Sequence, residues 1–188
     1  MSELEQLLSD IENAETNSLA RKNWQPKQIG AIDIRIAADG VWYHEGRPFR
    51  RAALTRLFAS VLRRENNHYY LITPAEKLSI QVDDAPFVAT MVERINDGES
   101  NALVFTTSLG DRIIADAQHP IRVEIDAVSQ QPRPYILVRD GLEALIGRNA
   151  FFELVNMADE RETDGKIYLT ITSMGTEFIL GRADENTL

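Results

Sequence analysis

The sequence predicts an α+β fold built by internal duplication, with mainly antiparallel sheets. Apolar and polar residues alternate through most of the chain, as they do in half-buried strands, while a few stretches place apolar residues at helical spacing. The order strand, turn, helix, strand, strand occurs twice. We therefore divide the 188 residues into an N-terminal helix and linker at 1–28, a first α+β half at 29–84, and a second, more β-rich half at 85–188.

The first half follows an amphipathic helix expected at residues 3–15, where leucine and isoleucine recur on one helical face. Residues 32–49 alternate about an Asp-Gly pair, which predicts a β-hairpin. A helix is expected next at 50–64, where apolar residues again recur at helical spacing. A pair of strands at 69–73 and 77–82 completes this half.

The second half is mainly β. A helix is expected at 148–158, and a hairpin at 167–180 ends the pattern. Strands are predicted before the helix at 87–95, 102–108, 111–117, 121–128 and 134–139. The side chains expected in the core from the two helices are Leu54, Leu57, Phe58 and Val61, and Phe151 or Phe152 with Leu154 and Val155.

The two internal helices indicate the repeat, because their residues match at a constant offset of 97. The matches join Arg51, Ala53, Leu54, Leu57, Phe58 and Val61 to Arg148, Ala150, Phe151, Leu154, Val155 and Ala158. Any amphipathic helix between strands would give some apolar matches, but the shared Arg-x-Ala opening and the shared element order favour duplication. Two small units would bury more surface by packing together, so a ligand cleft is expected between them.

Positive charge is concentrated in one stretch of an acidic protein. The formal net charge of −9 argues against broad nucleic-acid binding, yet the chain has sixteen arginines against four lysines. Six of these arginines lie between Gly46 and Arg64, in GRPFRRAALTRLFASVLRR. The excess of arginine over lysine is explained either by the composition of a GC-rich genome or by an anion site, since the guanidinium fork suits carboxylates and phosphates.

Arginines are also expected where helices begin, with Arg50 and Arg51 in the first turn of one helix and Arg148 at the start of the other. The helix dipole disfavours cations there by about 0.3–1 kcal/mol each. Solvent or the protein's own carboxylates could relieve this cost, and so could a bound anion held where the two helix starts converge. The candidate internal carboxylates are those of Glu45, Glu76, Asp84 and Glu143.

Signatures of common catalytic sites are absent from the sequence. There is no phosphate-binding loop, nucleophile elbow or zinc-protease motif, and no cysteine. The three histidines are far apart, and His44 is expected to have a structural role. Asp83-Asp84 could bind a cation, although an acidic turn is the commoner meaning. We expect no cofactor, no metal, no membrane span and a cytoplasmic location, because no long apolar run or secretory signal occurs.

Three phrases of the sequence resemble a known bacterial family: IDIRIAADGVWYHEGRPFRRAALTRLFASVLRRE, YYLITPAEKLSIQVDDAPF and PYILVRDGLEALIGRNAFFELV. With the β segment between them, they look like the domain of unknown function 1285 over about residues 29–180. The resemblance implies a duplicated α+β core whose second half is superficially similar to pleckstrin-homology-like folds. It also implies a nucleotide-like ligand at the interface of the halves and a role in signal transduction, and it supplies no catalytic residue.

Three functions remain open at this point. The first is a small-ligand-binding module for an anionic, nucleotide-like ligand, with an aromatic ring of Trp42 or Tyr135 stacked on it. The second is a small enzyme acting on a phosphorylated metabolite, with Glu76, Asp84 or His44 as acid or base, and the third is a domain that binds a protein partner. The candidate ligand-binding residues are Trp42, His44, Arg51, Glu76, Asp84, Tyr135, Arg139, Glu143 and Arg148.

Overall fold

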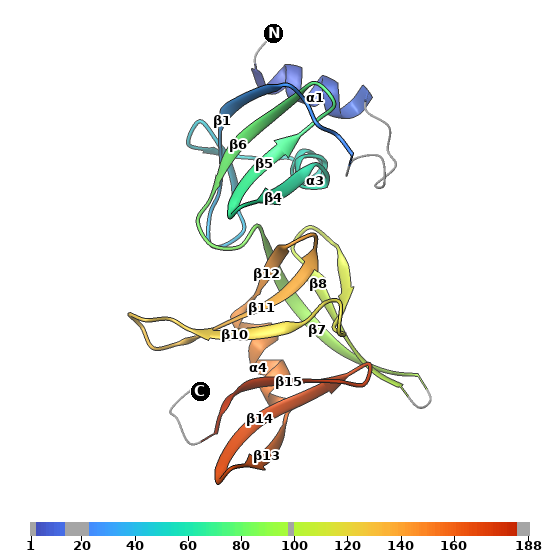
Figure 1. Cartoon of the computed structure of the whole chain (residues 1–188), viewed down its shortest axis with the longest axis vertical. Coiled ribbons are helices and arrows are strands. Elements are labelled where there is room, and N and C mark those ends of the chain that lie inside the picture. The colour runs from blue at the N-terminus through green and yellow to red at the C-terminus, as the bar shows by residue number, and fades with distance from the viewer. Residues whose placement is uncertain (1–2, 14–22, 98–99, 184–188) are drawn as a thin grey trace. The chain divides into compact units, whose positions relative to one another are not determined.

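The computed structural model describes residues 3–13, 23–97 and 100–183. Two compact units make up the chain, Met1–Asp84 and Ala85–Leu188, and each is described here by itself (Figure 1). The end of the predicted first helix and much of the predicted linker lie outside the described residues. No described helix is long and apolar enough to cross a bilayer.

The first unit is a six-stranded mixed sheet with two helices. Its elements are α1 (Glu3–Asn13), β1 (Gln28–Ile36), β2 (Trp42–His44), β3 (Arg47–Pro48), α3 (Ala52–Ser60), β4 (Leu62–Glu65), β5 (His68–Ile72) and β6 (Glu76–Val82). The strand order is β3-β2-β1-β6-β5-β4. Two antiparallel meanders, β1–β3 and β4–β6, are joined by the parallel pairing of β1 with β6. The predicted hairpin about Asp39-Gly40 is confirmed, since Ile36 pairs with Trp42.

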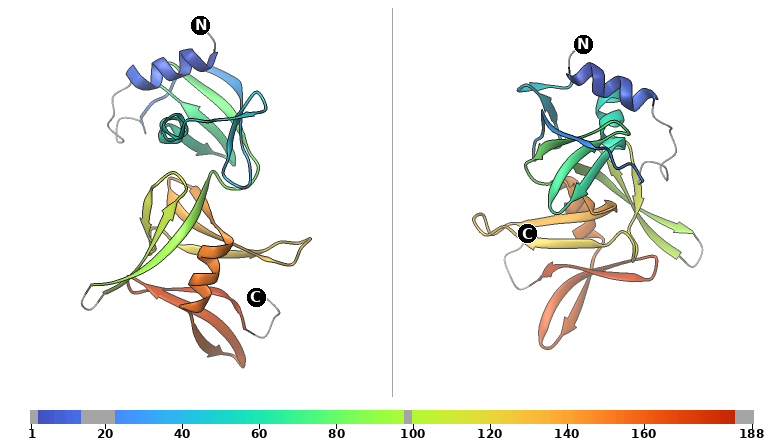
Figure 2. Two further views of the ribbon diagram at one scale, coloured as in Figure 1. Left: turned by 180° about the vertical axis from the view of Figure 1, so that it is seen from behind. Right: turned by 45° about the horizontal axis from the view of Figure 1, so that its top comes forward.

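Both helices of this unit lie beside its strands in each view (Figures 1 and 2). Helix α1 buries Leu7 and Ile11, which the amphipathic pattern places on one face. Helix α3 is shorter than predicted, because Leu62 begins strand β4. Its buried residues are Thr55, Phe58 and Ala59.

The predicted core of α3 is therefore only partly right. Phe58 and Val61 are buried as expected, whereas Leu54 and Leu57 are half-buried. The reason is the helical period: the buried face is centred close to Thr55, with Phe58 and Ala59 on either side of it, so Leu54 lies at its margin and Leu57 lies further away. An aromatic contact strengthens this face, with the rings of Phe49 and Phe58 separated by 5.5 Å between centroids.

The second unit contains another six-stranded sheet, one helix and a separate three-stranded sheet. Its elements are β7 (Phe87–Asp97), β8 (Ser100–Thr107), β9 (Arg112–Ile114), β10 (Ile121–Ile125), β11 (Pro132–Arg139), β12 (Leu142–Ile146), α4 (Arg148–Asn156), β13 (Asp159–Thr163), β14 (Lys166–Ser173) and β15 (Thr176–Arg182). The larger sheet has the order β10-β11-β12-β7-β8-β9, and β12 pairs in parallel with β7.

The two six-stranded sheets share one strand order. In each, two three-stranded meanders are joined by a parallel pairing of the first strand with the last. The helices do not occupy equivalent places: α3 lies between the third and fourth strands of its sheet, whereas α4 follows the sixth strand and leads into β13–β15.

The repeat predicted at an offset of 97 is therefore wrong in register. The similar elements are β1–β6 and β7–β12, not the two helical segments with the strands that follow them. Helix-to-helix matching failed because amphipathic helices share apolar spacing wherever they stand in a fold.

Within the second unit, helix α4 and the small sheet pack against strands of the six-stranded sheet. Ala150 and Leu154 are the buried residues of α4, so the prediction for Leu154 is confirmed. Phe152 is 62% exposed, and Phe151 and Val155 are half-buried.

A buried hydroxyl, that of Ser173, connects β14 to the region of β8. It accepts a hydrogen bond from the Leu103 N–H at 2.9 Å and donates one to the Ala115 carbonyl at 2.6 Å. These two hydrogen bonds tie the small sheet to the six-stranded sheet within the second unit.

Four hairpin turns use a non-glycine residue with positive φ followed by a glycine with positive φ. Asp140 and Asp164 suit this backbone, since Asp and Asn tolerate the left-handed region. Met174, with φ of 49°, does not have that advantage, and its side chain is 49% exposed.

Replacing Met174 by Asn is therefore expected to stabilise the protein by about 0.5 kcal/mol, because Asn fits the left-handed turn better. Thermal unfolding would measure the change. Met91→Asn is the matched control: Met91 is also exposed but lies within strand β7, where Asn is disfavoured. A loss of stability in Met174→Asn would contradict the turn argument.

Candidate functional site

A group of exposed arginines lies around the start of α3. Its members are Arg47, Arg50, Arg51 and Arg56, and we call them the arginine segment. None of the four forms an ion pair with a described residue. The protein's own carboxylates in the described chain therefore leave this charge uncompensated.

The start of α3 has no side-chain cap. Arg51 occupies the N-cap position, with extended backbone angles, and its carbonyl accepts hydrogen bonds from the N–H groups of Leu54 and Thr55 at 3.0 and 3.4 Å. Arg50 and Arg51 thus precede the helix, and the prediction that they lie in its first turn is corrected. Amide groups at an uncapped helix start, together with guanidinium groups, form an environment suited to an anion.

Trp42 is placed differently from the expectation. Its side chain is 2% exposed, and its indole Nε1 has no hydrogen-bond partner in the structure. A ring covered in this way offers no face for stacking on a ligand, so Trp42 is better assigned to the core.

The other candidates in the first unit lie on separate elements. His44 is half-buried and its ring stacks on Phe49 at 6.2 Å between centroids, which supports a structural role. Glu76 is buried at the start of β6, where its N–H donates to the Thr73 hydroxyl at 3.1 Å. Asp84 is half-buried at the end of the unit.

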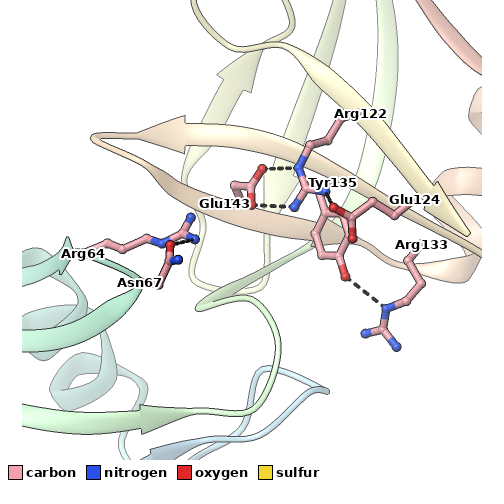
Figure 3. A network of polar contacts seen from close by, with 7 residues as sticks. All are labelled: Arg64, Asn67, Arg122, Glu124, Arg133, Tyr135 and Glu143. Carbon is pink, nitrogen blue, oxygen red and sulfur yellow. Dashed lines mark hydrogen bonds and ion pairs between the residues drawn. The ribbon is translucent and has the colours of Figure 1, made fainter. Parts of the chain in front are cut away.

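In the second unit, three neighbouring strands hold a polar network (Figure 3). Arg122 donates from Nε and Nη2 to the two carboxylate oxygens of Glu143, at 2.6 and 2.7 Å. Its guanidinium lies 4.3 Å from the ring centroid of Tyr135, and it also pairs with Glu124. The Tyr135 hydroxyl accepts a hydrogen bond from Arg133 Nε at 3.0 Å.

This network is a structural link between β10, β11 and β12. The hydrogen bonds that Arg122 donates to Glu143, above all, raise the pKa of Arg122, so its charge persists at every ordinary pH. Tyr135 is 4% exposed and lies under the Arg122 guanidinium, which leaves no open ring face for a ligand. The bidentate partner of Glu143, one of the candidate internal carboxylates, is Arg122.

Two candidate arginines of the second unit remain. Arg139 is half-buried, with its guanidinium 5.0 Å from the ring centroid of Phe87. Arg148 is the first residue of α4, is exposed, and forms no ion pair with a described residue. Gly147, at the N-cap of α4, provides no side-chain cap.

Sequence reasoning missed Arg122, because an arginine on a strand next to a glutamate resembles any exposed polar face. It also missed a hollow of about 410 Å³ in the first unit. Throughout the ranges that the structure describes, no group of three potential ligands could hold a metal ion.

The fold and these residues define a protein of two α+β units, each based on a six-stranded mixed sheet, with surface arginines at two helix starts that form no ion pair within the described residues. Its chain belongs to the DUF1285 family. The model described as "Domain of unknown function (DUF1285), N-terminal domain" matches residues 21–85, and that described as "Protein of unknown function (DUF1285), C-terminal domain" matches residues 86–180.

Two solved structures are similar to the chain. A DUF1285 family protein from Silicibacter pomeroyi is 41% identical, with a TM-score of 0.84 over 95% of this chain and 96% of that one. A DUF1285 family protein from Shewanella baltica is 31% identical, with a TM-score of 0.53 over 65% of this chain and 90% of that one. No curated protein matches the chain.

Proposed function

We propose that the protein is a small-ligand-binding module that takes an anionic, nucleotide-like ligand through the arginine segment, and that it acts in signal transduction. One observation carries the proposal: four exposed arginines around an uncapped helix start have no carboxylate partner in the described chain. In a protein of net charge −9, such a local concentration of guanidinium groups favours a ligand with phosphate or carboxylate groups.

Arg148 is the second candidate contact, since it is exposed at another uncapped helix start and forms no ion pair in the described part of the chain. The superficial likeness of the second unit to pleckstrin-homology-like folds belongs to the same proposal. The β-rich composition of this unit and the contact of α4 with β7 support that likeness. Such a likeness by itself assigns no ligand.

The test is a thermal-shift and calorimetric screen of the full chain against nucleoside mono-, di- and triphosphates and inorganic phosphate, with product analysis of each hit. Binding without turnover supports the proposal, because a ligand that binds only the native state raises the melting temperature. Turnover of a hit would instead indicate the small enzyme, and a silent screen would favour a protein-binding domain.

For a ligand found in this way, Arg51→Ala is expected to raise Kd by at least about tenfold, the loss typical of a charge-assisted contact. Arg51→Lys should also weaken binding, because a point charge cannot replace the guanidinium fork. Arg112→Ala is the matched control, since Arg112 is also exposed but is paired with Glu93 at 3.5 Å. Unchanged affinity in both Arg51 variants would exclude the arginine segment as the site.

A further inference from the structure

A hollow in the first unit is separate from the residues of the arginine segment. It lies along the end of β6 and beside the turn that joins β4 to β5, and its volume is about 410 Å³. The residues that line it are Asn67, His68, Tyr69, Ser79, Ile80, Gln81, Val82 and Asp83. This volume lies within the range of about 300–1,000 Å³ seen for small-molecule sites.

Hydrogen-bond donors and acceptors are balanced in this lining. Asn67 accepts a hydrogen bond from Arg64 at 2.8 Å through its carbonyl oxygen, which directs its amide N–H groups to other partners (Figure 3). His68 Nδ1 lies 2.9 Å from the Asn66 carbonyl, so with Nδ1 as the donor its Nε2 is an acceptor. Gln81 is exposed and supplies both a donor and an acceptor.

The hollow has charges of both signs. Asp83 is its one lining carboxylate, and Arg35 pairs with it at 3.2 Å. A second guanidinium borders the hollow, because Arg64 bonds to Asn67 and lies 5.8 Å from the ring centroid of Tyr69. These guanidinium groups disfavour a simple cation, and the lining carboxylate disfavours direct contact with a phosphate. The apolar atoms of Ile80 and Val82 and the ring of Tyr69 provide contacts for C–H groups.

Hydroxyl groups match such a surface, because each one both donates and accepts a hydrogen bond. We propose that the hollow binds a neutral polyhydroxylated molecule, a mono- or disaccharide. This site is additional to the proposed anion site and does not depend on it. The protein would then respond to two ligands of different charge.

The experiment is a ¹H–¹⁵N NMR titration of the full chain with glucose, N-acetylglucosamine and maltose. Saturable shifts are expected at residues 67–69 and 79–83 for at least one sugar. Gln81→Ala and Asp83→Asn should each raise Kd by about fivefold, since the first removes a hydrogen-bonding amide and the second replaces a carboxylate acceptor by an amide donor. Gln28→Ala is the matched control, an exposed glutamine of the same unit outside the hollow, and it should leave Kd unchanged.

Three results would overturn the proposal: no saturable shift with any of the sugars, shifts confined to residues outside the hollow, or unchanged Kd in both hollow variants. Gln81→Ala tests the sugar site without disturbing the ion pair of Asp83 with Arg35, because Gln81 takes no part in that pair. An Arg51→Ala protein should bind the sugar as the unmodified chain does, so failure of the anion site and failure of the hollow give different results.

Discussion

Replacing Phe58 by Ala is expected to destabilise the first unit by about 3–5 kcal/mol, the usual cost of removing a large aromatic side chain from a packed core. Phe58 is 0% exposed, lies on the buried face of α3 and contacts the Phe49 ring. The cavity cannot be filled by the short side chains of Thr55 and Ala59 that flank it on the same helix face.

The chain offers a selective probe for this measurement. Its two tryptophans are Trp24 and Trp42, and both lie in the first unit. Tryptophan fluorescence during urea unfolding therefore reports on that unit, and the midpoint gives the change in the free energy of unfolding.

Leu57→Ala is the matched control on the same helix. Leu57 is half-buried, so truncating it should cost less than half as much as truncating Phe58. Equal losses in the two variants would show that α3 presents a different face to the sheet.

The second large effect is expected for Glu143→Ala, which should destabilise the second unit by about 1–2 kcal/mol. The change leaves the Arg122 guanidinium over Tyr135 without its bidentate partner. Because the Arg122 side chain is 41% exposed and that of Glu143 20%, solvent screens the loss, and the value lies well below that of a fully buried pair.

Hydrogen exchange locates this effect, since amides of β10, β11 and β12 should exchange faster in Glu143→Ala than in the unmodified chain. Glu124→Ala is the control, because Glu124 also pairs with Arg122 but its side chain is 62% exposed. Faster exchange in Glu124→Ala than in Glu143→Ala would show that Glu124, not Glu143, is the carboxylate that stabilises these strands.

Local elements of the fold were predictable from sequence because they depend on neighbouring residues. The hairpin of β1 and β2, the pairing of β5 with β6 and the final hairpin of β14 and β15 are all confirmed. Alternation and turn residues specify such pairs directly.

Strand order was not predictable in the same way. Alternation tells which face of a strand is buried but not which distant strand lies beside it, so the parallel pairs β1–β6 and β7–β12 gave no signal. Strand β13 was missed for a different reason, since its residues Asp159–Thr163 are all polar and exposed and show no apolar alternation.

For the candidate site, the sequence predicted the unusual arginines but not their surroundings. The exposure of Arg51 and Arg148 fits a helix start, whereas aromatic residues such as Trp42 and Tyr135 look alike in sequence whether they are buried or open to a ligand. Arg122 became visible only when the pairing of three strands placed it beside Glu143 and Tyr135.

The parallel pairing of first and last strands has a consequence for synthesis of the chain on the ribosome. Gln28 pairs with Glu76, and Phe87 pairs with Ala144, so neither six-stranded sheet can close until its last strand has been translated. Contacts so distant in sequence slow folding, because the intervening chain must be ordered before they form. The first sheet is complete in sequence at Val82, before β7 begins at Phe87, so the nascent first unit can reach its native pairing while the second is still being made.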